Sequence, residues 1–139
     1  SRYEILLENY SKTVNIEALT MVDMARKEIL PAVEGYTKSL AETLAAKKAA
    51  VAGLPCKYET ATITKLSELS DEIADATANL DSEIAKFQAI EDVTEAANDI
   101  RDVILGKMDA LRAVCDEAET ITAKEFWPFP TYSDILFYV

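Results

Sequence analysis

Few residues in this sequence have side chains suited to acid–base or nucleophilic chemistry. The chain has no histidine, which removes the most common general base and metal ligand and every His-containing catalytic triad. It also removes the Glu-x-x-His di-iron site, otherwise the first idea for an acidic helical protein. Cys56 and Cys115 do not form a CxxC motif. Cys115 falls within an apolar helical rhythm, so we predict that it packs as a small core residue.

Two acidic stretches are the remaining candidates for chemistry, because carboxylates attract divalent cations. They read SDEIADATANLDSE (70–83) and IEDVTEAANDIRD (90–102). Neither has the ligand spacing or the glycine of an EF-hand loop, and solvated helix faces with pairs such as Asp109 and Arg112 explain them better. The chain also lacks the GxGxxG and GxxxxGK[ST] phosphate-binding motifs. We therefore predict no catalytic residue, no cofactor-binding residue and no metal ligand in this chain.

The overall charge limits the kinds of partner. The 139 residues carry a net charge of −11, which repels phosphate backbones and anionic lipid surfaces, so we expect no nucleic-acid and no membrane partner. Two distant thiols fit a reducing compartment. Residues 1–52 carry seven basic and seven acidic side chains, while residues 53–125 hold most of the excess acid. This contrast suggests a separate role for the neutral segment.

Hydrophobic periodicity predicts an all-α domain over residues 1–125, an antiparallel bundle of three long helices. We place the helices at about 3–52, 59–90 and 93–124. Pro31 removes a backbone donor and predicts a kink in the first helix. Gly53 suits the C-cap of that helix, with Pro55 just beyond it.

Seven-residue repeats predict how the second and third helices pack side by side. The second helix repeats Leu66, Ile73, Leu80 and Phe87, and the third has one row of Val93, Ile100, Val114 and Ile121 beside another of Ala97, Ile104, Leu111 and Ala118. Asp92 and Glu95 can form a capping box that starts the third helix after a short turn. A continuous helix through Asp92 is the alternative.

The first half of the first helix is apolar on two sides. The main stripe is Tyr3, Leu6, Leu7, Tyr10, Val14, Met21, Val22, Ala25 and Ile29, and the second is Ile5, Ile16, Leu19 and Leu30. We predict that one stripe meets the helical hairpin and that the other meets protein absent from this chain. The alternative is a wide core face. Ser1 leads directly into this pattern, which suggests part of a longer protein, and Tyr3, Leu7 and Tyr10 are the candidate docking residues.

Residues 126–139 form a predicted aromatic tail. Pro128 and Pro130 block a helix there, and the exposed tail would leave a large apolar patch. The candidate docking residues of this tail are Trp127, Phe129, Tyr132, Leu136 and Phe137. We favour docking of the tail on a neighbouring domain or subunit, with folding back over its own bundle as the alternative.

Three blocks of the sequence resemble a known family. They are RYEILLENYSKTVNIEALTMVDMARKEILPAV (2–33), RDVILGKMDALRAVCDEAE (101–119) and WPFPTYSDILFYV (127–139). Together they resemble the C-terminal region of type III glutamine synthetase, the large bacterial form of that enzyme. The first and last blocks are the most specific, and the middle of the chain adds little.

The resemblance implies a non-catalytic, structural domain of a larger ligase. The parent enzymes join ammonia to glutamate with ATP and magnesium, and they are cytoplasmic homo-oligomeric rings. Their ligands for substrate, nucleotide and metal lie upstream of this region, so none is carried over to these residues. The implied partners are the chain's own catalytic domain and neighbouring subunits. Two alternatives are a free-standing helical self-association module and a small ligand-binding bundle with a pocket near the tail aromatics.

Overall fold

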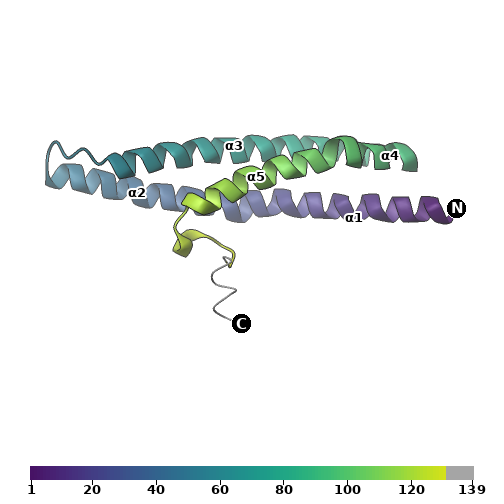
Figure 1. Ribbon diagram of the computed structural model, residues 1–139, viewed down its shortest axis with the longest axis horizontal. Helices are drawn as coiled ribbons and strands as arrows, with labels where there is room; N and C mark the ends of the chain where they lie inside the picture. Colours follow the sequence, from purple (N-terminus) through teal and green to yellow (C-terminus); the bar gives the residue numbers. More distant parts are fainter. Residues whose placement is uncertain (131–139) are drawn as a thin grey trace.

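The computed structural model describes residues 1–130, which fold into three long helical rods (Figure 1). The first rod is α1 (Arg2–Met24), the π-helical turn η1 (Ala25–Ile29) and α2 (Leu30–Ala50); the second is α3 (Lys57–Gln88); the third is α4 (Val93–Asp99), the π-helical turn η2 (Ile100–Ile104) and α5 (Leu105–Ile121). A short 3₁₀ turn, η3 (Lys124–Phe126), follows. Residues 1–130 contain no strand, so the predicted all-α class with three long helices is confirmed.

The connection between the first and second rods differs from the prediction. The first rod ends at Ala50, because Val51 leaves the helical region with φ −135°. The predicted C-cap at Gly53 is therefore wrong, although Gly53 has φ +84° and makes the turn that follows. Cys56 precedes α3 in the left-handed region with φ 43°. Because Cys56 is the N-cap, α3 begins two residues earlier than the predicted position 59.

Pro31 is accommodated by a wider turn just before it. The N–H of Leu30 donates to the carbonyl of Ala25, five residues back, at the end of η1. A proline ring clashes with the carbonyl four residues before it, and a π turn relieves that crowding without ending the helix. The irregularity next to Pro31 is therefore a π turn over Ala25–Ile29, and the kink stays a prediction.

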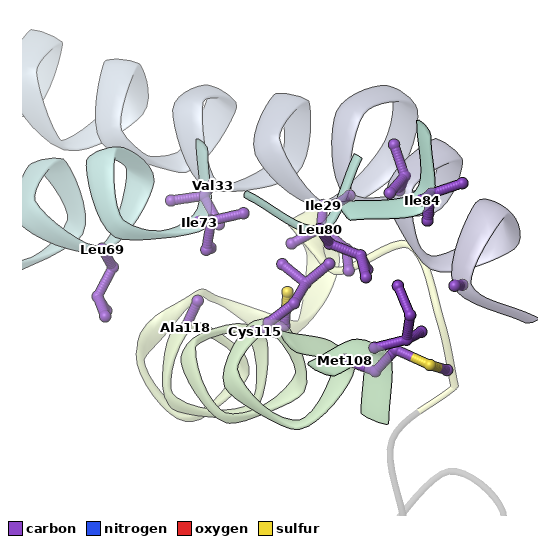
Figure 2. Close-up of a cluster of buried hydrophobic side chains, with 14 of the residues drawn as sticks. Ile29, Val33, Leu69, Ile73, Leu80, Ile84, Met108, Cys115 and Ala118 are labelled. Carbon is purple, nitrogen blue, oxygen red and sulfur yellow. The ribbon is translucent and has the colours of Figure 1, made fainter. Parts of the chain in front are cut away.

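The core lies where α3 packs between the other two rods (Figures 1 and 2). Leu66, Ile73 and Leu80 of the predicted heptad row are fully buried, and Phe87 is half-buried. Leu69 and Ile84 are also buried and widen this row. The fully buried leucine and isoleucine side chains each contribute roughly 1.5–3 kcal/mol through loss of apolar surface from water.

From Ile104 onward, the third rod buries its second predicted row more deeply than its first, although Ile100 of the first row is also fully buried. Ile104, Leu111 and Ala118 are at most 1% exposed, whereas Val114 and Ile121 are half-buried. The π turn η2 widens the helix at this point and changes which face meets α3. The chain breaks between α3 and α4, which rules out the continuous helix. Here Asp92 accepts the backbone N–H of Glu95 at 2.9 Å, one half of the predicted capping box.

Candidate docking surface

The N-terminal end of α1 carries exposed aromatic and aliphatic side chains. Tyr3 is 70% exposed, Leu6 60% and Tyr10 51%, while Leu7 is half-buried. Figure 1 shows why: the first turns of α1 extend past the turn that joins α3 to α4. The described residues thus leave the beginning of the main apolar stripe uncovered. We call Tyr3, Leu6, Leu7 and Tyr10 the docking row.

The same stripe turns into the core farther along α1. Ser11, Val14 and Ala18 are each at most 5% exposed, because α4 packs along this part of α1. The helix supplies both segments of one stripe at spacings of three and four residues. Between Tyr10 and Val14, the stripe therefore changes from uncovered surface to buried core.

The second apolar stripe of α1 is also largely uncovered. Ile16 is 63% exposed, Ile5 59% and Leu19 40%. Ile16 and Leu19 line an open depression with Thr20 and Asp23. Leu30, the last member of this stripe, instead packs beside the core. The alternative that both stripes form one wide core face is therefore wrong for the described residues.

A groove lies next to the docking row, in the corner between α1 and the turn from α3 to α4. It has a volume of about 320 Å³. Phe87, Ile90, Val93 and Ala96 give it apolar walls, while Glu8, Ser11, Lys12, Gln88 and Glu91 complete its lining. Glu8 and Lys12 form an ion pair at 3.0 Å. We call this feature the corner groove.

The seam between α1 and α4 has an unusual electrostatic character. Burial raises the pKa of the Asp99 carboxyl, and Glu83, Asp102 and Glu95 raise it further, against a smaller opposing effect of Lys86. Asp99 Oδ2 is buried and accepts no hydrogen bond within residues 1–130. This end of the molecule therefore has a negative potential that the described part of the chain does not neutralise.

The described part of the tail packs on the chain itself. Trp127 and Phe129 are half-buried against the core, with ring centroids 6.4 Å apart, and Phe126 lies 5.4 Å from Tyr36. For Trp127 and Phe129, the structure shows the folding-back alternative rather than the favoured docking on a neighbour. The other three tail candidates, Tyr132, Leu136 and Phe137, lie outside the described residues.

A second, smaller depression lies beneath these aromatic rings, near the position where the sequence left a ligand pocket open. It has a volume of about 210 Å³ and lies between α1, η1 and α5. Met21, Met24, Leu111 and Cys115 line it together with Trp127 and Phe129. Arg112 at its edge is paired with Asp109 at 3.0 Å, the surface pair that the sequence predicted. Arg112 is thus committed to an internal pair, while Asp116 and Glu119 complete the polar lining of the depression.

The two thiols have core environments. Cys115 and Cys56 are both 8% exposed, and burial raises the pKa of the Cys115 thiol to about 11. A thiol with such a pKa stays protonated at neutral pH, and the protonated form is a poor nucleophile. This confirms that Cys115 packs as a core residue. Between residues 1 and 130, no three or more His, Cys, Asp or Glu side chains gather closely enough to hold a metal ion.

Sequence reasoning missed the polar residues of the α1–α4 seam. Ser11 continues the row of Leu7, Val14 and Ala18, but it was not singled out. The available signal was a small polar residue at an apolar position of the helical repeat. The burial of Asp99 was harder to predict, because Asp99 lies within an acidic stretch that the sequence assigns to a solvated helix face.

None of the helices in the described range of residues 1–130 is both apolar enough and long enough to span a membrane.

Comparison with known proteins finds that this chain is similar in sequence to one enzyme family. Residues 1–48 match the family described as the glutamine synthetase C-terminal domain. The chain is 36% identical over 137 residues to a glutamine synthetase from Butyrivibrio fibrisolvens and 26% identical over 141 residues to a type-3 glutamine synthetase from Dictyostelium discoideum. Each alignment covers 99% of this chain but only about a fifth of the relative, 20% and 19% respectively. The resemblance that the three sequence blocks indicate is therefore confirmed: the chain is similar over nearly its whole length to glutamine synthetases and, in its first 48 residues, to their C-terminal domain family.

Proposed function

We propose that this chain is the non-catalytic, helical C-terminal domain of a glutamine synthetase-like ligase and acts as a structural element of its assembly. The parent enzyme would join ammonia to glutamate with ATP and magnesium, in the cytoplasm, as a homo-oligomer. The chain would dock on its own catalytic domain and on neighbouring subunits. The similarity to glutamine synthetases, of which the chain spans only about a fifth, supports this proposal.

The observation that carries the proposal is the uncovered docking row on α1. Tyr3, Leu6 and Tyr10 lie in the N-terminal part of α1 and are each at least half exposed. A contiguous group of large apolar side chains on a helix end marks a surface that binds protein. This row also lies within the 48 residues that match the C-terminal domain family.

The side chains of this chain support a structural role. The sequence has no histidine, and both cysteines are buried. Three ion pairs join one rod to another: Arg26 to Asp81 at 3.1 Å, Lys65 to Glu117 at 3.0 Å and Lys47 to Glu59 at 2.7 Å. These groups hold three rods in register, which is what a scaffold needs.

The direct test changes the docking row in the full-length parent protein. Leu6→Ser should reduce the mass of the assembly in sedimentation and reduce ligase activity in parallel, because it removes apolar contact area without touching the core. Val51→Ser is the matched control, since Val51 is 54% exposed but lies in the loop at the other end of the rods. An assembly of unchanged mass and activity in Leu6→Ser would remove the docking role.

The self-association alternative has lost its main support. Its heptad row, Leu66, Ile73 and Leu80, is fully buried within one chain and is not available to a second copy. The docking row remains as a possible dimer contact, and sedimentation of the isolated chain separates the two functions. A monomer at micromolar concentration fits the proposed domain, whereas a stable dimer fits the module.

A further inference from the structure

The corner groove has an orphaned hydroxyl on its floor. Ser11 is 4% exposed and lines the groove, and its Oγ has no hydrogen-bond partner among residues 1–130. A buried polar atom without a partner costs free energy, so native proteins seldom leave one unsatisfied. The serine thus points to a group that is missing from the described chain.

Two more oxygens, on α1 and α4, are in the same condition. Asn15 Oδ1, one turn after Ser11 on α1, and Asp99 Oδ2 on α4 are both buried without a donor from the described residues. Neither residue lines the groove, where Ser11 Oγ and the Glu91 carboxylate can accept hydrogen bonds.

The rim of the groove is negatively charged. Glu91 lines it, and Glu95 follows on the first turn of α4; neither has an ion-pair partner in the part of the chain that the structure describes. Lys12 is the basic residue of the lining, and Glu8 already neutralises it. Burial is the largest cause of the raised pKa of Asp99, and Glu95 adds a smaller contribution to it.

We propose that the corner groove binds an arginine side chain on a basic, partly apolar segment of the protein on which this chain docks. Phe87, Ile90 and Val93 would pack against the aliphatic stem, as apolar walls do for long basic side chains. The guanidinium has five N–H donors in a fixed plane, which suits a site with several separate acceptors better than the single ammonium of lysine. This inference rests on the proposed docking function and names the chemistry of its partner.

Charge argues against a second copy of this chain as the occupant. Each copy carries a net charge of −11, and the groove lies among carboxylates, so two such surfaces repel. A basic segment instead gains attraction and supplies the missing donors. The partner is thus defined by its chemistry as a cationic segment with an apolar side.

Photo-crosslinking in the full-length parent protein can identify the occupant. A benzophenone amino acid replaces Gln88, which is exposed and lines the groove, and mass spectrometry then identifies the attached peptide. We expect a peptide from outside residues 1–139 with an arginine within about one helical turn of the crosslinked atom. The same probe at Ser67, exposed on α3 far from the groove, is the control and should not capture that peptide.

Each other result of this experiment contradicts the inference. Capture of residues 1–139 from a second copy, of residues 131–139 of the same chain, of a peptide without a basic residue, or of nothing would overturn it. If Leu6→Ser still disrupts the assembly in that case, the proposed docking function survives and only the arginine site fails. If Leu6→Ser is also without effect, both fail.

Substitutions in the groove give a second, independent measurement. Ser11→Leu, which fills the floor, and Glu91→Gln, which removes rim charge, should each raise the protomer concentration at half-assembly roughly tenfold, the usual effect of losing one charge-assisted hydrogen bond. Ser67→Leu and Glu34→Gln are the matched controls at exposed positions and should change it less than twofold. Helical circular dichroism checks that Ser11→Leu still folds, and Glu91→Gln carries the test if it does not. Equal changes of this concentration in the groove variants and in the control variants would contradict the inference.

Discussion

Lys47 Nζ lies 2.7 Å from Glu59 Oε1, so an ion pair closes the turn between α2 and α3. The Glu59 side chain is only 7% exposed, whereas that of Lys47 is 47% exposed. The hydrogen bond from Lys47 lowers the pKa of Glu59, and the same bond raises the pKa of Lys47. The most deeply buried carboxylate of this connection is thus held by a lysine at the end of the first rod.

Replacement of Lys47 by methionine should destabilise the chain more than loss of an ordinary surface pair. The change leaves the buried Glu59 carboxylate without its cation. Urea denaturation checks this, with Lys38→Met as the control, because Lys38 is 79% exposed and 3.9 Å from Glu42. A Lys38 variant as unstable as the Lys47 variant would contradict the assigned role.

The same pair predicts a pH dependence of stability. Because the folded pKa of Glu59 is lower than its unfolded pKa, its contribution is complete above the unfolded pKa and is lost as the pH falls through the folded pKa. Thermal midpoints measured from pH 7 to acid should therefore fall, and Glu59→Gln should reduce the size of that fall. An unchanged acid profile in Glu59→Gln would show that other carboxylates dominate.

The same substitution should destabilise the chain strongly in the core and hardly at all in the docking row. Leu80→Ala removes a fully buried side chain and should lower the free energy of unfolding by about 2–5 kcal/mol. Leu6→Ala removes one that is 60% exposed, so its effect on the isolated chain should stay within about 0.5 kcal/mol. Denaturant titration of both variants provides the measurement, and a large loss in Leu6→Ala would mean that Leu6 is core.

Two glycines should give opposite results when replaced by alanine. Gly53 has φ +84°, which costs an L-residue about 1–2 kcal/mol, although no atom lies within 4 Å of the new Cβ. Gly106 lies in the helix α5 with equally open space around its Cβ, so alanine there should stabilise by about 0.5–1 kcal/mol. Thermal unfolding of the pair isolates backbone conformation from packing. Equal signs of the two changes would contradict this account.

The Cys115 thiol should resist alkylation in the folded chain. With its pKa raised to about 11 by burial, only about one thiol in ten thousand is ionised at pH 7. Iodoacetamide labelling in a Cys56→Ser background isolates this thiol, and unfolding in urea should raise the rate by orders of magnitude. Fast labelling of the native chain would mean that the α1–α5 depression opens to solvent.

Trp127 provides a test of where the tail packs, because it is the single tryptophan of the chain. Its half-buried position against the core predicts a blue-shifted emission and partial protection from iodide in the isolated chain. Phe129→Ala should shift the emission toward the red, since the two rings are in contact at 6.4 Å. An emission like that of free indole would place the tail away from these helices.

The amino-acid sequence alone determined the helical class, the approximate extent of the three helices and the residues of the α3 core row. These features follow from local rules: apolar side chains at spacings of three, four and seven residues must face one direction on a helix. The sequence also located Asp92 as the start of the third rod, because a carboxylate can cap the free N–H groups there. Each of these features depends on residues that are neighbours along the chain.

The tertiary structure decided how the stripes of α1 are used. Val14 and Tyr10 belong to the same stripe, yet Val14 is 5% exposed and Tyr10 51%, because α4 covers only part of α1. The packing of a distant helix, rather than any property of the first helix, sets that boundary. The fold-back of Trp127 and the unpaired oxygen of Ser11 likewise result from contacts between residues far apart in sequence, which no local pattern specifies.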